Sequence, residues 1–202
     1  MLTYDAEASF IAHVKSQTSG FEGYWDRHTL GTYYDDQGQR QASRLVSDSL
    51  TINNFCNLPE HAADRYTFLF RCYVLASGAS VYQILTTDDP DSPMELSVQR
   101  ELGYLTFYAA GARPQYLWKL EAKEVNQETE RTGNFRGVTL DMLNDKGERW
   151  SWLGLRQKGG KLTPYGRKDE WKYWYCSVSA DGYHNDPELI SDIYIQRLGL
   201  HD

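Results

Sequence analysis

The sequence predicts an all-β fold for this chain, and three observations support that prediction. Between Arg65 and Tyr108, β-branched and aromatic residues alternate with polar residues, and turn signals such as Ser77-Gly78 separate the runs. Beyond the N-terminal region, turn signals at this spacing predict roughly nine to eleven short strands, which is typical of antiparallel sandwiches and barrels. With 202 residues, of which 41% are hydrophobic, the chain is long enough to bury one core. We therefore expect a single domain, residues 1–202, built of antiparallel strands.

The N-terminal region departs from this alternation. Phe10, Ile11 and Val14 lie at helical spacing behind a polar start. This spacing predicts a short helix within residues 1–20, ahead of a β region that spans residues 21–202.

Strand alternation also predicts which side chains fill the core, because only one face of each strand points inward. Near the C-terminus, residues 188–198 suit a helix or a strand, and their β-branched and aromatic residues favour a closing strand. From the central strands, the core is expected to draw on Phe68, Phe70, Val81, Ile84, Leu96, Val98 and Leu105.

Composition and charge exclude several classes of function. A net charge of −7 disfavours binding to nucleic acid, and the lack of a long apolar run excludes a membrane-spanning helix. The acidic N-terminal segment lacks the basic start and apolar run of an export signal, so the chain as written is expected to be cytoplasmic. A chain whose leader had been cleaved would instead be secreted. The sequence leaves the oligomeric state open.

We expect no cofactor and no metal site. The chain has no phosphate-binding loop, dinucleotide fingerprint, nucleophile elbow or zinc-protease motif, and its five histidines are scattered. The acidic turn from Asp88 to Asp91 is more typical of a solvated loop than of a calcium site. The three cysteines have no paired spacing, which predicts buried free thiols.

An aromatic cluster late in the chain indicates a ligand site. In an extended strand, Trp171, Tyr173 and Tyr175 share one face, while Lys172 and Trp174 share the other. Because both faces carry large rings, at least one row is expected to line a groove or cavity. We predict that Trp171, Lys172, Tyr173 and Trp174 bind a polysaccharide or a small molecule.

The apolar strand around Gln83, the acidic turn after it and the P-x-x-L strand that begins at Pro93 resemble the central strands of jelly-roll (concanavalin-like) polysaccharide lyases. The resemblance implies an antiparallel jelly-roll β-sandwich that cleaves a uronate-containing polymer by β-elimination, with Tyr82 among the ligand-binding residues. Such an enzyme must neutralise the uronate carboxylate and move a proton. The implied catalytic residues are Gln83 and Arg44 for the first task, and Tyr175, Tyr183 and His184 for the second.

The segment from Phe21 to Trp25 supports a different architecture. Its Gly23-Tyr24-Trp25 triplet resembles the G-x-W motif of lipocalin-like barrels, which implies that Trp25 closes one end of a barrel over a pocket for an apolar or pigment-like molecule. About eight strands suffice for such a barrel, and the larger predicted number favours the sandwich. A barrel that binds or transforms a small apolar molecule is the alternative, and a non-catalytic carbohydrate-binding module is the third hypothesis.

Overall fold

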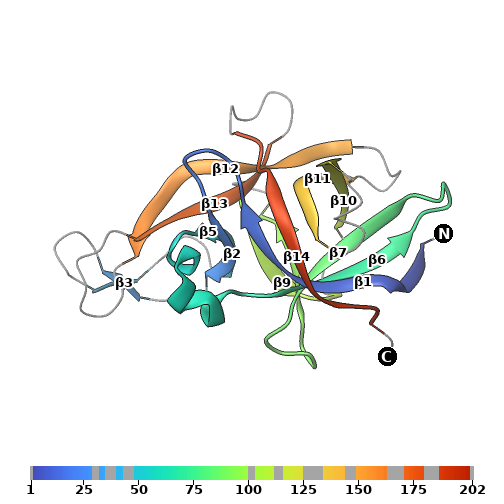
Figure 1. Ribbon diagram of the computed structural model, residues 1–202, viewed down its shortest axis with the longest axis horizontal. Helices are drawn as coiled ribbons and strands as arrows, with labels where there is room; N and C mark the ends of the chain where they lie inside the picture. Colours follow the sequence, from blue (N-terminus) through green and yellow to red (C-terminus); the bar gives the residue numbers. More distant parts are fainter. Residues whose placement is uncertain are drawn as a thin grey trace.

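Antiparallel strands form most of the described chain (Figure 1), which confirms the predicted all-β class. The computed structural model describes residues 2–28, 32–34, 40–42, 48–99, 103–111, 116–124, 134–143, 149–162, 171–179 and 187–200. No helix within these ranges is long and apolar enough to cross a membrane. The elements are β1 (Thr3–Ser16), β2 (Gly23–His28), β3 (Thr32–Tyr34), β4 (Arg40–Ala42), β5 (Ser49–Asn53), η1 (Phe55–Asn57), η2 (Pro59–Asp64), β6 (Phe68–Val74), β7 (Ser80–Thr86), β8 (Met94–Val98), β9 (Leu105–Ala109), β10 (Leu117–Glu124), β11 (Phe135–Leu143), β12 (Arg149–Leu162), β13 (Trp171–Ser179) and β14 (Ser191–Leu198).

The predicted N-terminal helix is wrong, because the same residues form the long strand β1. From Phe10 to Ser16, every second side chain of β1 is buried, which is the period of a strand. β14 pairs with one edge of β1, and β6 and β2 pair with the other. These neighbours supply the backbone hydrogen bonds, so long-range pairing overrides the local helical spacing. The predicted C-terminal strand is confirmed as β14.

The strand pairing closes on itself. β1, β6, β7, β10, β11 and β14 pair in that order, and β14 returns to β1, so these strands form a closed six-strand ring. β2, β5, β13 and β12 run from β1 to β11, and the β8–β9 hairpin connects β7 to β5. In Figure 1, the β6–β7 hairpin and the start of β1 lie on the right, while β2, β5 and β13 lie on the left. β3 and β4 form a separate pair.

Aromatic side chains from different strands meet inside the six-strand ring. The ring of Phe10 lies with its centroid 4.8 Å from that of Phe70, 5.6 Å from Tyr82 and 5.8 Å from Phe135. Because β1 and β11 are not neighbours, the contact between Phe10 and Phe135 crosses the interior. The ring of strands therefore encloses part of the hydrophobic core.

The predicted core residues are confirmed as buried, all seven of them. Val81 is buried on the opposite face of β7 from Ile84 and lies outside the main cluster. The cysteines are free and buried, as predicted.

Candidate functional site

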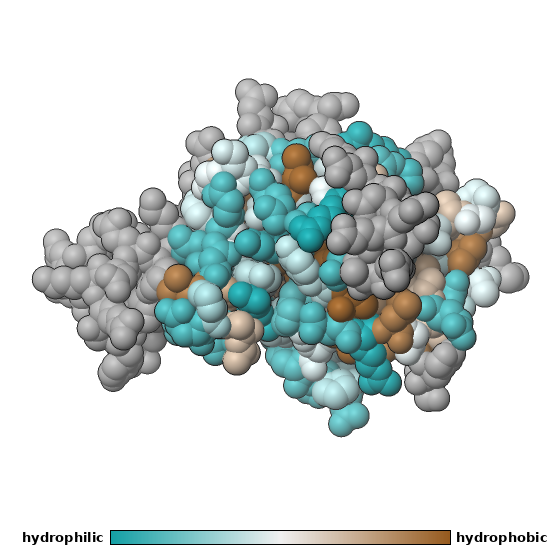
Figure 2. Space-filling model, viewed as in Figure 1, coloured by the Kyte–Doolittle hydropathy of each residue, from teal (hydrophilic) through white to brown (hydrophobic). Residues whose placement is uncertain are grey.

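One end of the six-strand ring leaves apolar side chains half-buried. Antiparallel pairing places the starts of β7 and β11 and the ends of β10 and β14 at this end. Figure 2 shows hydrophobic side chains at the surface over the crossing of β1 and β14. The half-buried side chains that pack on the core here, called the open end, are Tyr82, Leu120, Ala122, Phe135 and Ile195.

A β-bulge turns one aromatic ring toward this end. Gly137 has a φ of 59°, and the register between β11 and β14 shifts between Phe135 and Val138. Glycine adopts this left-handed conformation readily, and bulges of this kind re-aim neighbouring side chains. The bulge thereby allows the ring of Phe135 to reach Phe10.

Three polar side chains border the open end. Asp5 lies opposite Cys72 in the β1–β6 register, and Tyr82 lies opposite Cys72 in the β6–β7 register. Burial raises the pKa of both Tyr82 and Cys72, and the nearby charge of Asp5 acts in the same direction. The Tyr82 hydroxyl therefore stays protonated at neutral pH and donates a hydrogen bond to the Cys72 thiol.

The opposite side of the interior is filled by aromatic rings and is called the closed end, defined by Trp25, Phe68 and Phe107. Trp25 is fully buried, and its ring meets Phe68 edge-on at 5.9 Å. Phe68 in turn stacks on Phe107 at 5.8 Å. Phe68 begins β6, whereas the open end lies toward the last residues of β6.

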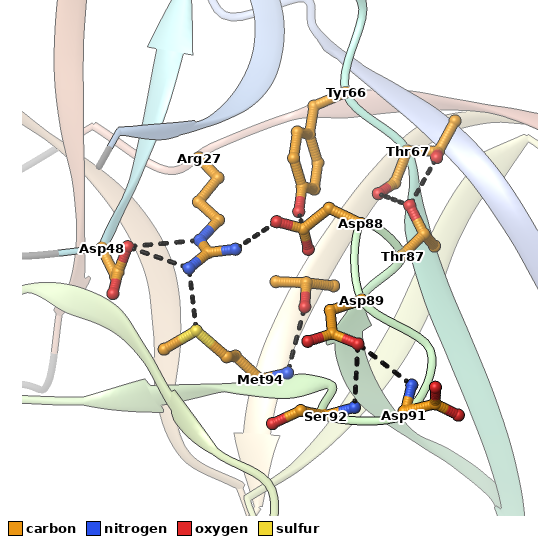
Figure 3. Close-up of polar contacts among 11 residues, drawn as sticks. Arg27, Asp48, Tyr66, Thr67, Thr87, Asp88, Asp89, Asp91, Ser92 and Met94 are labelled. Carbon is orange, nitrogen blue, oxygen red and sulfur yellow. Dashed lines mark hydrogen bonds and ion pairs between the residues drawn. The ribbon is translucent and has the colours of Figure 1, made fainter.

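A charged network lies beside the closed end (Figure 3). The Arg27 guanidinium donates to the carboxylate of Asp48 at 3.1 Å and to that of Asp88, and it contacts the sulfur of Met94. The Tyr66 hydroxyl donates to Asp88 at 2.6 Å. Because Asp88 follows β7, the network ties that turn to β2 and closes this end of the interior.

Electrostatics keep this network charged at neutral pH. Burial alone would lower the pKa of Arg27, but the contact with Tyr66 and the charges of Asp48 and Asp88 outweigh it and raise that pKa. Burial would raise the pKa of Asp88, but the Tyr66 hydrogen bond and the Arg27 charge outweigh it and lower that pKa. Every charged group in the network thus has an opposite partner, which is typical of a structural tie.

Gln83, Tyr173 and Tyr175 share one face of the sheet, opposite to the core. Strand pairing traces this face from β7 through β8, β9 and β5 to β13. β8, β9 and β5 lie between Gln83 and the two tyrosines along this route, and an isolated bridge between Tyr104 and Ser177 also brings the start of β9 beside β13. The residues of this second face, called the polar face, are Gln83, Glu95, Ser97, Thr106, Ser49, Thr51, Asn53, Tyr173 and Tyr175, and all of them except the half-buried Tyr175 are buried.

Gln83 itself has close partners within the polar face. Its Oε1 accepts a hydrogen bond from the Tyr73 hydroxyl at 3.3 Å, and its side chain also bonds to Glu95. Burial raises the pKa of Glu95, although the Tyr116 backbone N–H, which donates to it at 2.9 Å, and Gln83 oppose the shift. Sequence reasoning missed Glu95, because Glu95 occupies an ordinary polar position in an alternating strand.

The other predicted site residues are divided between several places. Tyr82 faces the core at the open end, and Trp174 faces the core beside Phe21, whose ring lies 5.3 Å away. Trp171 and Lys172 begin β13, and their side chains lie outside the described part of the structure. The remaining predicted site residues, Arg44, Tyr183 and His184, lie outside the described residues.

Sequence reasoning missed most of the open end. Leu120, Ala122, Phe135 and Ile195 are ordinary apolar strand residues, so no local signal marks them. The G-x-W triplet was the one signal that favoured a barrel with an open end, and it lies at the closed end.

Comparisons with protein-family models, with curated proteins and with solved structures find no match to this chain. The resemblances to lyases and to lipocalin-like barrels therefore stay predictions, and the proposals below rest on the chain's own geometry.

Proposed function

We propose that the protein is a barrel-like binder of a small, flat, mostly apolar molecule. This ligand would bind at the open end of the six-strand ring. The observation that supports this most is the half-buried state of Tyr82, Phe135, Leu120 and Ala122, at one end of a core whose opposite side is filled by Trp25. Ligand sites in proteins are mostly apolar, with a few polar groups that fix orientation. Tyr82 and Asp5 supply such groups here.

The closed ring of strands favours the lipocalin-like alternative over the jelly-roll sandwich. A ring of six strands is narrower than the roughly eight-stranded barrels that hold one small ligand inside. The ligand would therefore lie across the end of the ring, with its flat face against Tyr82 and Phe135, rather than deep within it. Aromatic rings in such offset contacts contribute about 0.5–1.5 kcal/mol beyond the burial of their area.

Filling the open end is expected to abolish most of this binding. Ala122 pairs with the core residue Val138, so a larger side chain at position 122 points to the open end. Ala122→Trp should weaken binding of Nile red and of diphenylhexatriene about tenfold or more, because the indole occupies the place of the ligand. Titration of each probe, followed by its fluorescence in an apolar environment, measures the change.

Lys119→Trp is the matched control, because position 119 lies on the opposite face of β10 and is exposed. It should leave the affinity for both probes within about twofold, since an exposed pair such as Lys119 with Glu121 contributes little. Failure of the wild-type protein to bind either probe would contradict the proposed function. Equal losses in both variants would show that the probes bind elsewhere.

The polar face supports a second candidate, the carbohydrate-active protein that the lyase resemblance implies. Gln83 shares this face with Tyr173 and Tyr175, which is the side-by-side placement that the lyase resemblance implies, with Gln83 and Tyr173 buried and Tyr175 half-buried. A lyase should release an unsaturated, ultraviolet-absorbing product from one of a panel of uronate polymers, and Gln83→Ala should slow that release about 10²-fold. Binding of a polymer without turnover would indicate a carbohydrate-binding module. If the protein neither bound a polymer nor released an absorbing product, this candidate would be excluded.

A further inference from the structure

Two polar groups inside the six-strand ring have no partner in the described chain. Trp118 of β10 and Ser191 of β14 are fully buried, and neither Trp118 Nε1 nor Ser191 Oγ has a hydrogen-bond partner among the described residues. Buried polar groups in folded proteins nearly always have a partner, and a lost partner is costly. Each group therefore has the capacity to bond to a ligand that reaches it.

Both groups lie just inward of the open end. Trp118 pairs with Tyr82 across β7 and β10, and it shares a strand face with Leu120 and Ala122. Exposure rises along this face, from the fully buried Trp118 to the half-buried Leu120 and Ala122. Trp118 therefore lies next inward from Leu120 on this face of β10.

On β14, Ser191 also lies on the face that points into the six-strand ring. By alternation it shares a face with Ile193, which is fully buried, and with Ile195 of the open end. It pairs with Val138 of β11, the residue opposite Ala122. The indole N–H and the hydroxyl thus face the interior from two strands that β11 separates.

The width and charge of this end limit which group can enter. A six-stranded ring is narrower than the roughly eight-stranded barrels that hold one small ligand, so only a small functional group of the ligand would enter it. Asp5 adds a negative charge beside Tyr82 and Cys72, and it repels an anionic group. A neutral acceptor satisfies the Trp118 N–H without this repulsion.

We infer that the ligand of the open end carries a neutral hydrogen-bond acceptor, such as a ring carbonyl, which points inward to the Trp118 indole N–H and the Ser191 hydroxyl. This inference rests on the proposed function and narrows its ligand class. Pure hydrocarbons would bind by contact with Tyr82 and Phe135 alone, whereas flat carbonyl compounds gain the hydrogen bond as well.

Two probes and two tryptophan variants test the inference. Nile red is flat, neutral and carries a ring carbonyl, whereas diphenylhexatriene is a hydrocarbon. Trp118→Phe should weaken Nile red binding about fivefold, the scale of one neutral hydrogen bond, and should change diphenylhexatriene binding less than twofold. Trp25→Phe is the matched control, because Trp25 is also fully buried with an unpartnered Nε1, but at the closed end. It should change neither affinity more than twofold.

The possible outcomes separate the two proposals. Binding of both probes with equal losses in Trp118→Phe would overturn the inference alone, because Trp118 would then act only by packing. If neither probe bound the wild-type protein, both the proposed function and the inference would fail.

A measurement on the wild-type protein keeps the inference testable if Trp118→Phe does not fold. The indole N–H signal of Trp118, assigned by through-bond NMR, should shift downfield when Nile red is added and should not do so with diphenylhexatriene. The indole signal of Trp25 should stay in place with both probes. An unmoved Trp118 signal at saturating Nile red would overturn the inference.

Discussion

Trp25→Ala should lower the free energy of unfolding by about 3–5 kcal/mol, the range for removing a large buried aromatic side chain. Trp25 is fully buried at the closed end, where its ring meets Phe68 at 5.9 Å. Phe68 also stacks on Phe107, so the cavity left by the Trp25 ring would loosen the packing of both phenylalanine rings. Urea unfolding followed by circular dichroism gives the change, provided that the slope of the transition is the same in both proteins.

Tyr4→Ala is the control for loss of an aromatic ring as such. Tyr4 is 38% exposed, and its main contacts are the ring of Tyr73 at 5.8 Å and the carbonyl of Leu200. It should cost less than Trp25→Ala, because more than a third of the Tyr4 side chain stays exposed to water on folding. A Trp25→Ala protein no less stable than Tyr4→Ala would show that the closed end does not depend on the tryptophan.

The central strands were predictable because their alternation is local. Ile84, Leu96 and Leu105 sit in stretches where every second side chain is apolar, and each is fully buried in the structure. A strand whose apolar and polar residues alternate can be recognised without knowledge of its neighbours, although the structure buries both faces of these strands. That is why the all-β class and most of the core could be predicted from sequence.

β1 was not predictable in the same way. Phe10 and Val14 fit one turn of a helix as well as two steps of a strand, so their spacing alone does not decide. The decision comes from β14, which lies at the other end of the chain and pairs with β1 from Phe10 to Ser16. The information that makes this segment a strand is therefore not contained in the segment.

The same reasoning explains why the open end escaped prediction. It combines Tyr82, Ala122 and Phe135 from three strands, and none of these residues has chemistry that marks a site. The predicted site instead followed residues with conspicuous chemistry, such as Gln83 and Tyr175, which the register places on strands that are not neighbours. Polar residues can be selected as site candidates from the sequence alone, whereas an apolar end of a barrel can be identified only once the pairing of distant strands is known.

Gly23→Ala should lower the free energy of unfolding by about 2–3 kcal/mol, the upper part of the range for overpacking a filled site. A Cβ atom at position 23 would lie 2.6 Å from the backbone oxygen of Asn53 and 2.9 Å from a methyl carbon of Ile52. The oxygen belongs to the β5 backbone, so it cannot turn aside as a flexible side chain would. β2 and β5 would have to separate, and that shift would also disturb the packing of Trp25, which pairs with Ile52.

Gly20→Ala separates this steric cost from the ordinary cost of replacing a glycine. Gly20 has a φ of 82° and no atom within 4 Å of an added Cβ, so its alanine variant should lose only about 1–2 kcal/mol through backbone strain. Gly23 is not in the left-handed region, so its cost should come from the contact with β5 alone. If Gly23→Ala unfolds at the same urea concentration as the wild-type protein, the close approach of β2 to β5 is not required. In that case, the glycine of the G-x-W triplet would have no role in seating Trp25 at the closed end.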